Sequence, residues 1–167
     1  MFERAGFAVD SVSHVFGGQY LWLEATPAAG ADGSPPGAGD LQAASGRFER
    51  CANAWIGDIR ERVRSLAADG PIAVWGAGAK GVTFVNQIDP AREMINCLVD
   101  LNPNKWGRFV PGTGHPIHGV RDVSRLGITR ALLTNINYFD EIAELLRTEH
   151  MSVELLDVMD LSPLSRS

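Results

Sequence analysis

Cysteine is scarce in this chain of 167 residues, and no long apolar run occurs in it. Two cysteines, Cys51 and Cys97, are too few for a disulfide framework or a four-cysteine zinc site, so we expect both to be buried packing residues in a reduced cytoplasm. No run approaches the roughly 20 apolar residues of a membrane helix, and the first residues lack the basic start and apolar stretch of a signal peptide. These features predict a cytoplasmic protein without a membrane partner.

Positively charged residues are also fewer than negatively charged ones, with 15 Lys and Arg against 20 Asp and Glu. The net charge of −5 argues against nucleic acid as a partner. Hydrophobic residues make up 45% and charged residues 21%, which is an ordinary globular composition. The length suits one domain with appendages and leaves no room for both the cofactor domain and the substrate site of a complete dehydrogenase or methyltransferase.

Residues 1–25 are expected to hold a β-hairpin that has no sheet to join. Residues 7–14 and 19–25 are rich in β-prone side chains, and Gly17-Gly18 between them permits the turn. Two strands alone are marginally stable in water, and nothing downstream offers them a sheet. The hairpin therefore indicates that a partner element is missing from the chain.

Residues 26–41 are expected to form a flexible linker. Thr26–Asp40 contains three Pro, four Gly and four Ala, which is 11 of its 15 residues. Such a segment buries too little apolar surface to offset the entropy that it would lose on ordering.

Residues 42–68 show the period of an amphipathic helix, which Gly70-Pro71 should end. Its apolar residues recur at spacings of 4, 3, 4, 4 and 3 and are Phe48, Ala52, Trp55, Ile59, Val63 and Leu66.

Short apolar runs alternate with helical patterns after residue 70. The continuous run Ile72–Trp75 is typical of a buried parallel strand. Further strands are expected at 94–99, 116–120, 131–135 and 152–158, and helices at 82–88 and 138–149. This alternation predicts an α/β, Rossmann-like three-layer domain over residues 42–167, with helices on both faces of a mostly parallel sheet of about five strands.

A glycine-rich turn between the first strand and the next helix carries the sharpest local signal. It fits the pattern G-x-G-x-x-G, in which glycines let the backbone approach a phosphate and free N–H groups at the helix start hold the anion. An acid ends the following strand, where it can accept hydrogen bonds from a ribose. The alternative is a turn that serves only helix–sheet packing. The candidate binding residues are Gly76, Gly78, Ala79, Lys80, Gly81 and Asp100.

Two further loops follow expected strands and are candidates to line a ligand crevice. In the loop that follows the strand expected at 131–135, Asn137 either binds a ligand or caps the next helix, and capping is the favoured interpretation. Tyr138 either stacks on a base or covers the core edge. The long loop after Asp100 either binds a ligand or is a turn-rich connection with solvated basic residues. Its candidates are Asn104, Lys105, Gly112, Thr113 and His115.

No catalytic or metal-binding set can be placed in the chain. A Ser-His-Asp set, paired catalytic carboxylates and a Walker lysine are not evident. His14, His118 and His150 stand singly, without metal-ligand spacing, and His115 has no visible partner acid. We therefore predict neither catalytic residues nor metal ligands here.

Several linked motifs resemble the C-terminal domain of C-methyltransferases. They are Val74–Phe84, Asp100–Thr113, Pro116-Ile117, and Asn137-Tyr138 with Glu141-Ile142. That family includes enzymes that methylate deoxysugars attached to nucleoside diphosphates, with S-adenosylmethionine as methyl donor. The resemblance spans roughly residues 45–160. The positions that match the family motifs are Gly76, Gly78, Lys80, Gly81, Asp100, Asn104, Lys105, Pro111, Gly112, Thr113, Asn137 and Tyr138.

The resemblance implies that residues 1–25 are the tail of a class I methyltransferase domain and that the chain is a C-terminal fragment. In the family, S-adenosylmethionine and the catalytic base lie in the preceding domain. The chain should then bind and enclose a nucleotide-linked sugar without catalysing methyl transfer by itself. Two alternatives stay open. One is a small NAD(P)-binding module, resting on the glycine turn and Asp100. The other is a purely structural docking domain.

Overall fold

The computed structural model describes residues 2–18, 20–28 and 38–162. The chain divides into two compact units, Met1–Glu49 and Arg50–Ser167. Helix α1 (Ala38–Ala68) begins in the first unit and ends in the second.

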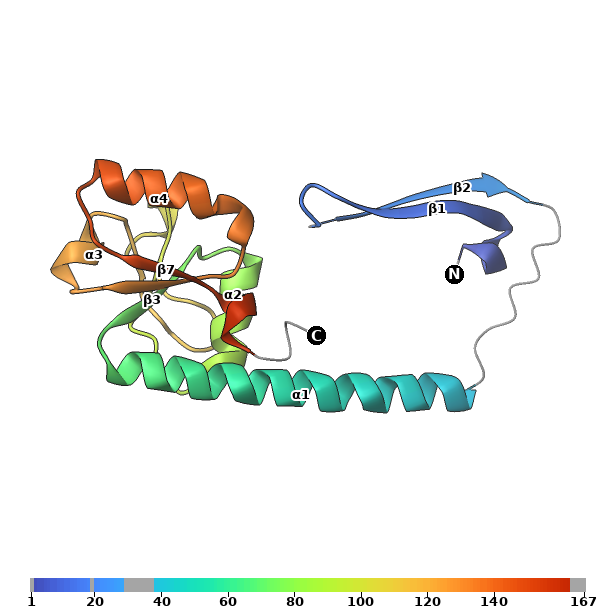
Figure 1. Ribbon diagram of the computed structural model, residues 1–167, viewed down its shortest axis with the longest axis horizontal. Coiled ribbons are helices and arrows are strands. Elements are labelled where there is room, and N and C mark those ends of the chain that lie inside the picture. Colours follow the sequence, from blue (N-terminus) through green and yellow to red (C-terminus); the bar gives the residue numbers. More distant parts are fainter. Residues whose placement is uncertain (1, 19, 29–37, 163–167) are drawn as a thin grey trace. The chain divides into compact units, whose positions relative to one another are not determined.

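The first unit holds the hairpin that the sequence predicts. A short 3-10 helix, η1 (Glu3–Ala5), precedes β1 (Phe7–Val15), which pairs antiparallel with β2 (Tyr20–Pro27) (Figure 1). Among the described strands, these two pair only with each other and join no larger sheet. The register shifts once, between Val9 and Ser11, as a β-bulge does.

The expected linker at residues 26–41 has different bounds in the structure. Thr26 and Pro27 belong to β2, and residues 38–41 belong to α1. The rest of the expected linker, apart from Ala28, is residues 29–37, which lie outside the described residues.

Helix α1 packs through only part of its apolar stripe. Ile59 and Val63 are fully buried, whereas Phe48, on the same stripe, is 77% exposed. The buried part is the one that shares a core with the sheet of the second unit. Cys51 was expected to be buried and is exposed, whereas Cys97 is buried as expected.

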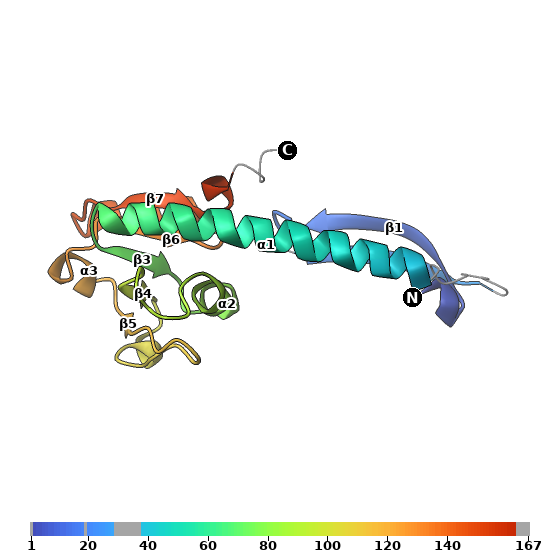
Figure 2. The ribbon, with the colours of Figure 1, turned by 90° about the horizontal axis from the view of Figure 1, so that it is seen from below.

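The second unit is an α/β domain with five parallel strands, as predicted. The strands are β3 (Ile72–Trp75), β4 (Cys97–Val99), β5 (Ile117–His118), β6 (Arg130–Leu133) and β7 (Glu154–Asp157). Their order is β5-β4-β3-β6-β7, which Figure 2 shows from bottom to top. The chain thus starts in the centre, builds one half of the sheet, and crosses over to build the other half.

Helices cover both faces of this sheet. The residues of α1 and of α2 (Ala79–Ile88) share one core with one face of β3, and α3 (Asp122–Arg125) and α4 (Phe139–Thr148) share a second core with the other face. Figure 1 shows α1 and α4 on opposite sides of the sheet. Three further 3-10 helices are η2 (Pro103–Lys105), η3 (Ile136–Tyr138) and η4 (Val158–Leu161).

The side chain of Asp89 explains why β4 starts later than predicted. The strand expected from Met94 begins at Cys97, because the amides of Glu93, Met94 and Ile95 donate to the carboxylate of Asp89 and not to a neighbouring strand. None of the helices in the described ranges is both long and apolar enough to cross a membrane.

Candidate functional site

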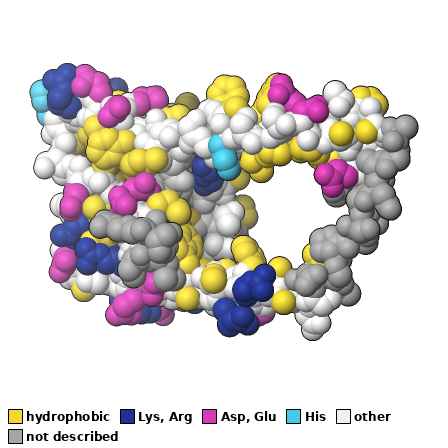
Figure 3. Space-filling model, turned by 45° about the vertical axis from the view of Figure 1, so that its right-hand side comes forward, with side chains coloured by type: hydrophobic (Ala, Val, Ile, Leu, Met, Phe, Trp, Pro, Cys, Tyr) yellow, Lys and Arg dark blue, Asp and Glu magenta, His cyan; other side chains and the backbone are white. Residues whose placement is uncertain are grey.

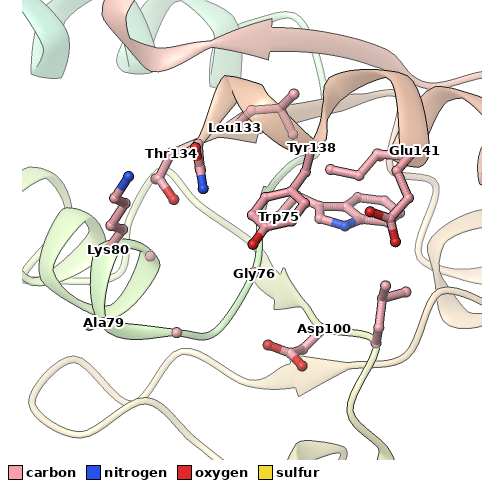
Figure 4. A pocket seen from close by; sticks show the side chains of 14 residues that line it. Trp75, Gly76, Ala79, Lys80, Asp100, Leu133, Thr134, Tyr138 and Glu141 are labelled. Carbon is pink, nitrogen blue, oxygen red and sulfur yellow. The ribbon is translucent and has the colours of Figure 1, made fainter. Parts of the chain in front are cut away.

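The loops that follow β3, β4 and β6 meet at the carboxyl edge of the sheet. The chain leaves β3 toward β4 on one side, and later enters β6 on the other side, so β3 and β6 flank the point where the strand order reverses. Ligands of open α/β sheets bind at such a point. A cavity of about 380 Å³ lies there (Figure 4). Its lining residues are Trp75, Gly76, Gly78, Ala79, Lys80, Gly81, Asp100, Leu101, Leu133, Thr134, Asn135, Tyr138, Glu141 and Ile142.

Two of the three glycines in the turn are required by the structure, each for a different reason, and the third is not. Gly76 has a φ of +97°, a conformation that side chains rarely adopt. A Cβ at Gly81 would lie 2.0 Å from the carbonyl oxygen of Gly76, so the helix packs against the turn only without a side chain there. A Cβ at Gly78 would meet no atom within 4 Å, so alanine would fit at this position.

Helix α2 points its N-terminus into the cavity. It begins at Ala79, three residues before the predicted start, and its amides at Ala79, Lys80 and Gly81 precede the first intrahelical bond, from Val82 N to Gly78 O at 3.0 Å. Amides in this position, together with the helix dipole, attract an anion. Lys80 adds a full positive charge and takes part in no ion pair among the described residues.

Asp100 and Lys105 fix the turn at Ala77. The amide of Ala77 donates to Asp100 Oδ2 at 2.7 Å, and Lys105 Nζ donates to the same carboxylate oxygen at 2.9 Å and to the carbonyl oxygen of Ala77 at 3.2 Å. The amide of Asn102 occupies Asp100 Oδ1 at 2.9 Å. Both oxygens of this carboxylate, which is 8% exposed, therefore have partners within the domain.

The charge of Asp100 is stabilised by these contacts. Burial opposes ionisation, but hydrogen bonds from Lys105 and from the amides of Asn102 and Ala77 outweigh it and hold the pKa of Asp100 below its usual value. Asp100 and Lys105 thus form a neutral pair at the edge of the cavity, and the pair sets the shape of the glycine turn.

The rest of the long loop lies away from the cavity. Asn104, Lys105, Gly112, Thr113 and His115 are absent from its lining. Gly112 has a φ of +94°, and a Cβ there would lie 2.1 Å from Asn86 Oδ1, so the loop packs tightly against α2 at this point. These residues shape the loop in the structure.

His115 belongs to a buried polar network, and the expectation that it lacks a partner acid is wrong. The imidazole is completely buried, with Nδ1 2.7 Å from Thr113 Oγ1 and Nε2 3.2 Å from Asp89 Oδ2. Burial opposes ionisation of Asp89, but the amides that it accepts and His115 hold its pKa below the usual value. The sequence separates these residues by 26 positions, so no local pattern signals the pair.

The segment after β6 supplies the wall opposite the glycine turn. Tyr138 lines the cavity, whereas Asn137 does not. The prediction that Asn137 caps the helix is wrong, because Asn137 lies inside η3, and Tyr138 stands at the N-cap of α4 without a side-chain cap bond. Some lining residues are not among the binding candidates named from the sequence, although Glu141 and Ile142 belong to a motif of the family resemblance. These lining residues are Trp75, Leu101, Leu133, Thr134, Asn135, Glu141 and Ile142.

Two signals in the sequence could have found some of these residues. Thr134 and Asn135 directly follow a buried strand, as cavity residues of parallel sheets do. Glu141 and Ile142 lie three and four positions after Tyr138, so a helix places them on the same face. In the described part of the chain, no group of His, Cys, Asp and Glu residues could hold a metal ion.

Comparison with known proteins identifies the family. The family model of the C-methyltransferase C-terminal domain matches residues 42–152. The chain belongs to this family. The match covers the whole cavity of the C-methyltransferase C-terminal domain and confirms the resemblance seen in its motifs. None of the curated proteins compared with the chain matches it. Among solved structures, the crystal structure of RSP, a Rex-family repressor, is similar over 52% of this chain and 51% of that chain, with 16% sequence identity and a TM-score of 0.37.

Proposed function

We propose that this C-methyltransferase C-terminal domain binds the nucleotide part of a nucleotide-linked substrate, such as a nucleoside diphosphate sugar. The observation that carries the proposal is the cavity at the reversal point of the sheet. It combines the amides at the start of α2, a lysine, Lys80, without an ion-pair partner in the described part of the chain, and largely apolar walls. Amides and a lysine suit a diphosphate. Apolar and aromatic walls suit a nucleobase.

The same proposal assigns the chemistry to a preceding methyltransferase domain. Methyl transfer needs S-adenosylmethionine and a base, and we infer that both belong to that domain. The C-terminal domain would orient the substrate and exclude water from it, which are contributions of position and environment. We expect no methyl transfer and no S-adenosylmethionine binding by this chain alone.

The hairpin is proposed to dock onto that preceding domain. Its register places Val9, Val12, Leu21 and Leu23 on one face together with Phe7. Val12 is 56% and Leu21 67% exposed, and Figure 3 shows hydrophobic side chains along the hairpin. An exposed apolar face on two strands is marginally stable unless another element covers it.

A small NAD(P)-binding module is the second candidate, because the glycine turn fits the dinucleotide pattern. That function requires an acid that is free to accept hydrogen bonds from the ribose. Asp100 stands at the expected strand end, but Ala77, Asn102 and Lys105 already occupy its carboxylate. This arrangement favours the nucleotide-linked substrate over NAD(P).

Calorimetric titration of the chain with UDP, NADH and S-adenosylmethionine tests the proposal. We expect UDP to bind and the other two not to bind. Lys80→Ala should weaken UDP binding about tenfold, as for the loss of a charge-assisted hydrogen bond, with little change in melting temperature. Arg121→Ala is the matched control, because Arg121 is an exposed cation of the same unit outside the cavity. Tight NADH binding, or an equal effect of both variants, would contradict the proposal.

A further inference from the structure

The charged side chains around the cavity are not equivalent. Lys80, Asp100 and Glu141 line it. Asp100 is neutralised by Lys105 at 2.9 Å and has both oxygens hydrogen-bonded. Lys80 and Glu141 have no ion-pair partner within the described residues, so they set the electrostatic character of the cavity.

These two charges mark opposite ends of the cavity. Lys80 lies on the first turn of α2, beside the free amides, and Glu141 lies on the first turn of α4. Figure 4 shows Lys80 and Glu141 on opposite sides, with Tyr138 and Trp75 between them. The cavity therefore has a positive end, an apolar middle and a negative end.

This polarity restricts the ligand and its orientation. A phosphate near Glu141 would meet a like charge, so the anionic group must lie at the α2 end. The other end of the ligand must present a hydrogen-bond donor, because an ionised carboxylate is an acceptor only. A nucleoside diphosphate has this layout, with phosphates at one end and donors on the ribose and the base at the other.

We propose that Glu141 is the specificity-determining residue of the cavity and accepts a hydrogen bond from the nucleoside part of the ligand, a ribose hydroxyl or a base N–H. The inference rests on the proposed function and adds to it the direction in which the nucleotide lies. Without such a role, the position of Glu141 in the first turn of α4 would be explained by the helix dipole, which favours acids there.

Asp140 separates these two explanations. It is exposed, precedes Glu141 in the same helical turn, and does not line the cavity. If the helix dipole explains both acids, removing either carboxylate should have a similar effect. If Glu141 binds the nucleoside, only the removal of the Glu141 carboxylate should weaken nucleotide binding.

The experiment measures the affinities of UDP and inorganic pyrophosphate by calorimetry for the 167-residue chain and for Glu141→Gln, Glu141→Ala and Asp140→Asn. Both Glu141 variants should bind UDP about five- to tenfold more weakly, as expected for a charge-assisted hydrogen bond at a partly open site. Pyrophosphate, which lacks the nucleoside, should bind them equally well or more tightly. Asp140→Asn should change neither affinity more than twofold, and thermal melts should show all variants to be folded.

A third ligand, 2′-deoxyuridine diphosphate, identifies the donor. If the 2′-hydroxyl donates to Glu141, wild type should bind the deoxy compound as weakly as Glu141→Ala binds UDP. If the base or another hydroxyl donates, the Glu141 variants should weaken both nucleotides equally. Either result supports the inference.

Three results would overturn the inference, and only the third also overturns the proposed function. Normal UDP binding by the Glu141 variants, or an equal loss in Asp140→Asn, would refute the role of Glu141 and leave the nucleotide site standing. If wild type binds neither UDP nor pyrophosphate, the proposed function is refuted as well.

Discussion

An alanine substitution at Gly81 should destabilise the chain, whereas one at Gly78 should be nearly neutral, although the motif treats the two glycines alike. At Gly81 the added Cβ would lie 2.0 Å from the carbonyl oxygen of Gly76, a backbone atom that cannot rotate away. At Gly78 the Cβ would meet no atom within 4 Å. The pair therefore tests whether the turn is built as the structure describes it.

The cost at Gly81 follows from what must move. Relieving the contact displaces Gly76 and Ala77, whose amides donate to Val99 O and Asp100 Oδ2, both at 2.7 Å. Weakening these buried bonds should cost about 2 kcal/mol. Overpacking adds about 2 kcal/mol, and the better helix propensity of alanine returns about 1 kcal/mol. The net loss in the free energy of unfolding is about 3 kcal/mol.

Urea denaturation followed by far-UV circular dichroism measures both variants against wild type. Gly78→Ala should stay within about 0.5 kcal/mol of wild type, because the new methyl group is unobstructed and replaces glycine at an N-cap with negative φ. If Gly81→Ala costs less than about 1 kcal/mol, or if both variants cost the same, the packing described for the turn is incorrect.

Two further predictions concern other parts of the chain. Asp89→Asn should lower the free energy of unfolding at pH 7 by about 2 kcal/mol, because the charged acceptor of several buried amides is lost. Since the pKa of Asp89 is lowered by folding, its contribution is present above an unfolded pKa of about 3.9 and is lost as the pH falls through the folded value, so the difference from wild type should shrink below about pH 4. An equal difference at pH 7 and pH 3 would show that charge is not the cause. In dilute solution, amides of β1 and β2 should exchange with solvent much faster than those of β3, because β1 and β2 pair only with each other among the strands that the structure describes. Slow exchange of residues 7–25 in a monomer would contradict this.

The sequence predicts the elements whose signals are local. Ile72–Trp75 is a strand with the predicted bounds, since four consecutive apolar residues between helix-breaking glycines leave few alternatives. The hairpin and the helix before the sheet are likewise marked by turn residues and by period. The bounds of β4 depend on Asp89, a side chain whose role is visible only in three dimensions.

The candidate site likewise contains residues that the sequence predicts and residues that it does not predict. The glycine turn is found because its spacing along the chain is its signal, and Gly76, Gly78, Ala79, Lys80, Gly81 and Asp100 all line the cavity. The long loop after Asp100 looks as rich in chemistry, but His115 turns inward to Asp89, and Lys105 turns to Asp100. Composition cannot distinguish a side chain that faces a ligand from one that fixes a loop, because both need polar groups. Trp75 is missed for the opposite reason, since an apolar strand residue resembles core until the cavity is seen beside it.

Asp100, which follows β4, stands where the dinucleotide pattern places its acid, but its carboxylate is bonded within the domain. In that pattern the glycine turn holds the phosphates and the acid holds the ribose. Here Lys105 comes five positions after Asp100, neutralises it, and bonds to Ala77 as well, so acid and base together support the turn. With Asp100 occupied, Glu141 is the remaining carboxylate of the cavity without an ion-pair partner in the described chain, and it stands on the opposite half of the sheet. Recognition of the nucleoside would thus move from the strand after the turn to the helix after the crossover, which is why the pattern of the turn alone does not identify the ligand.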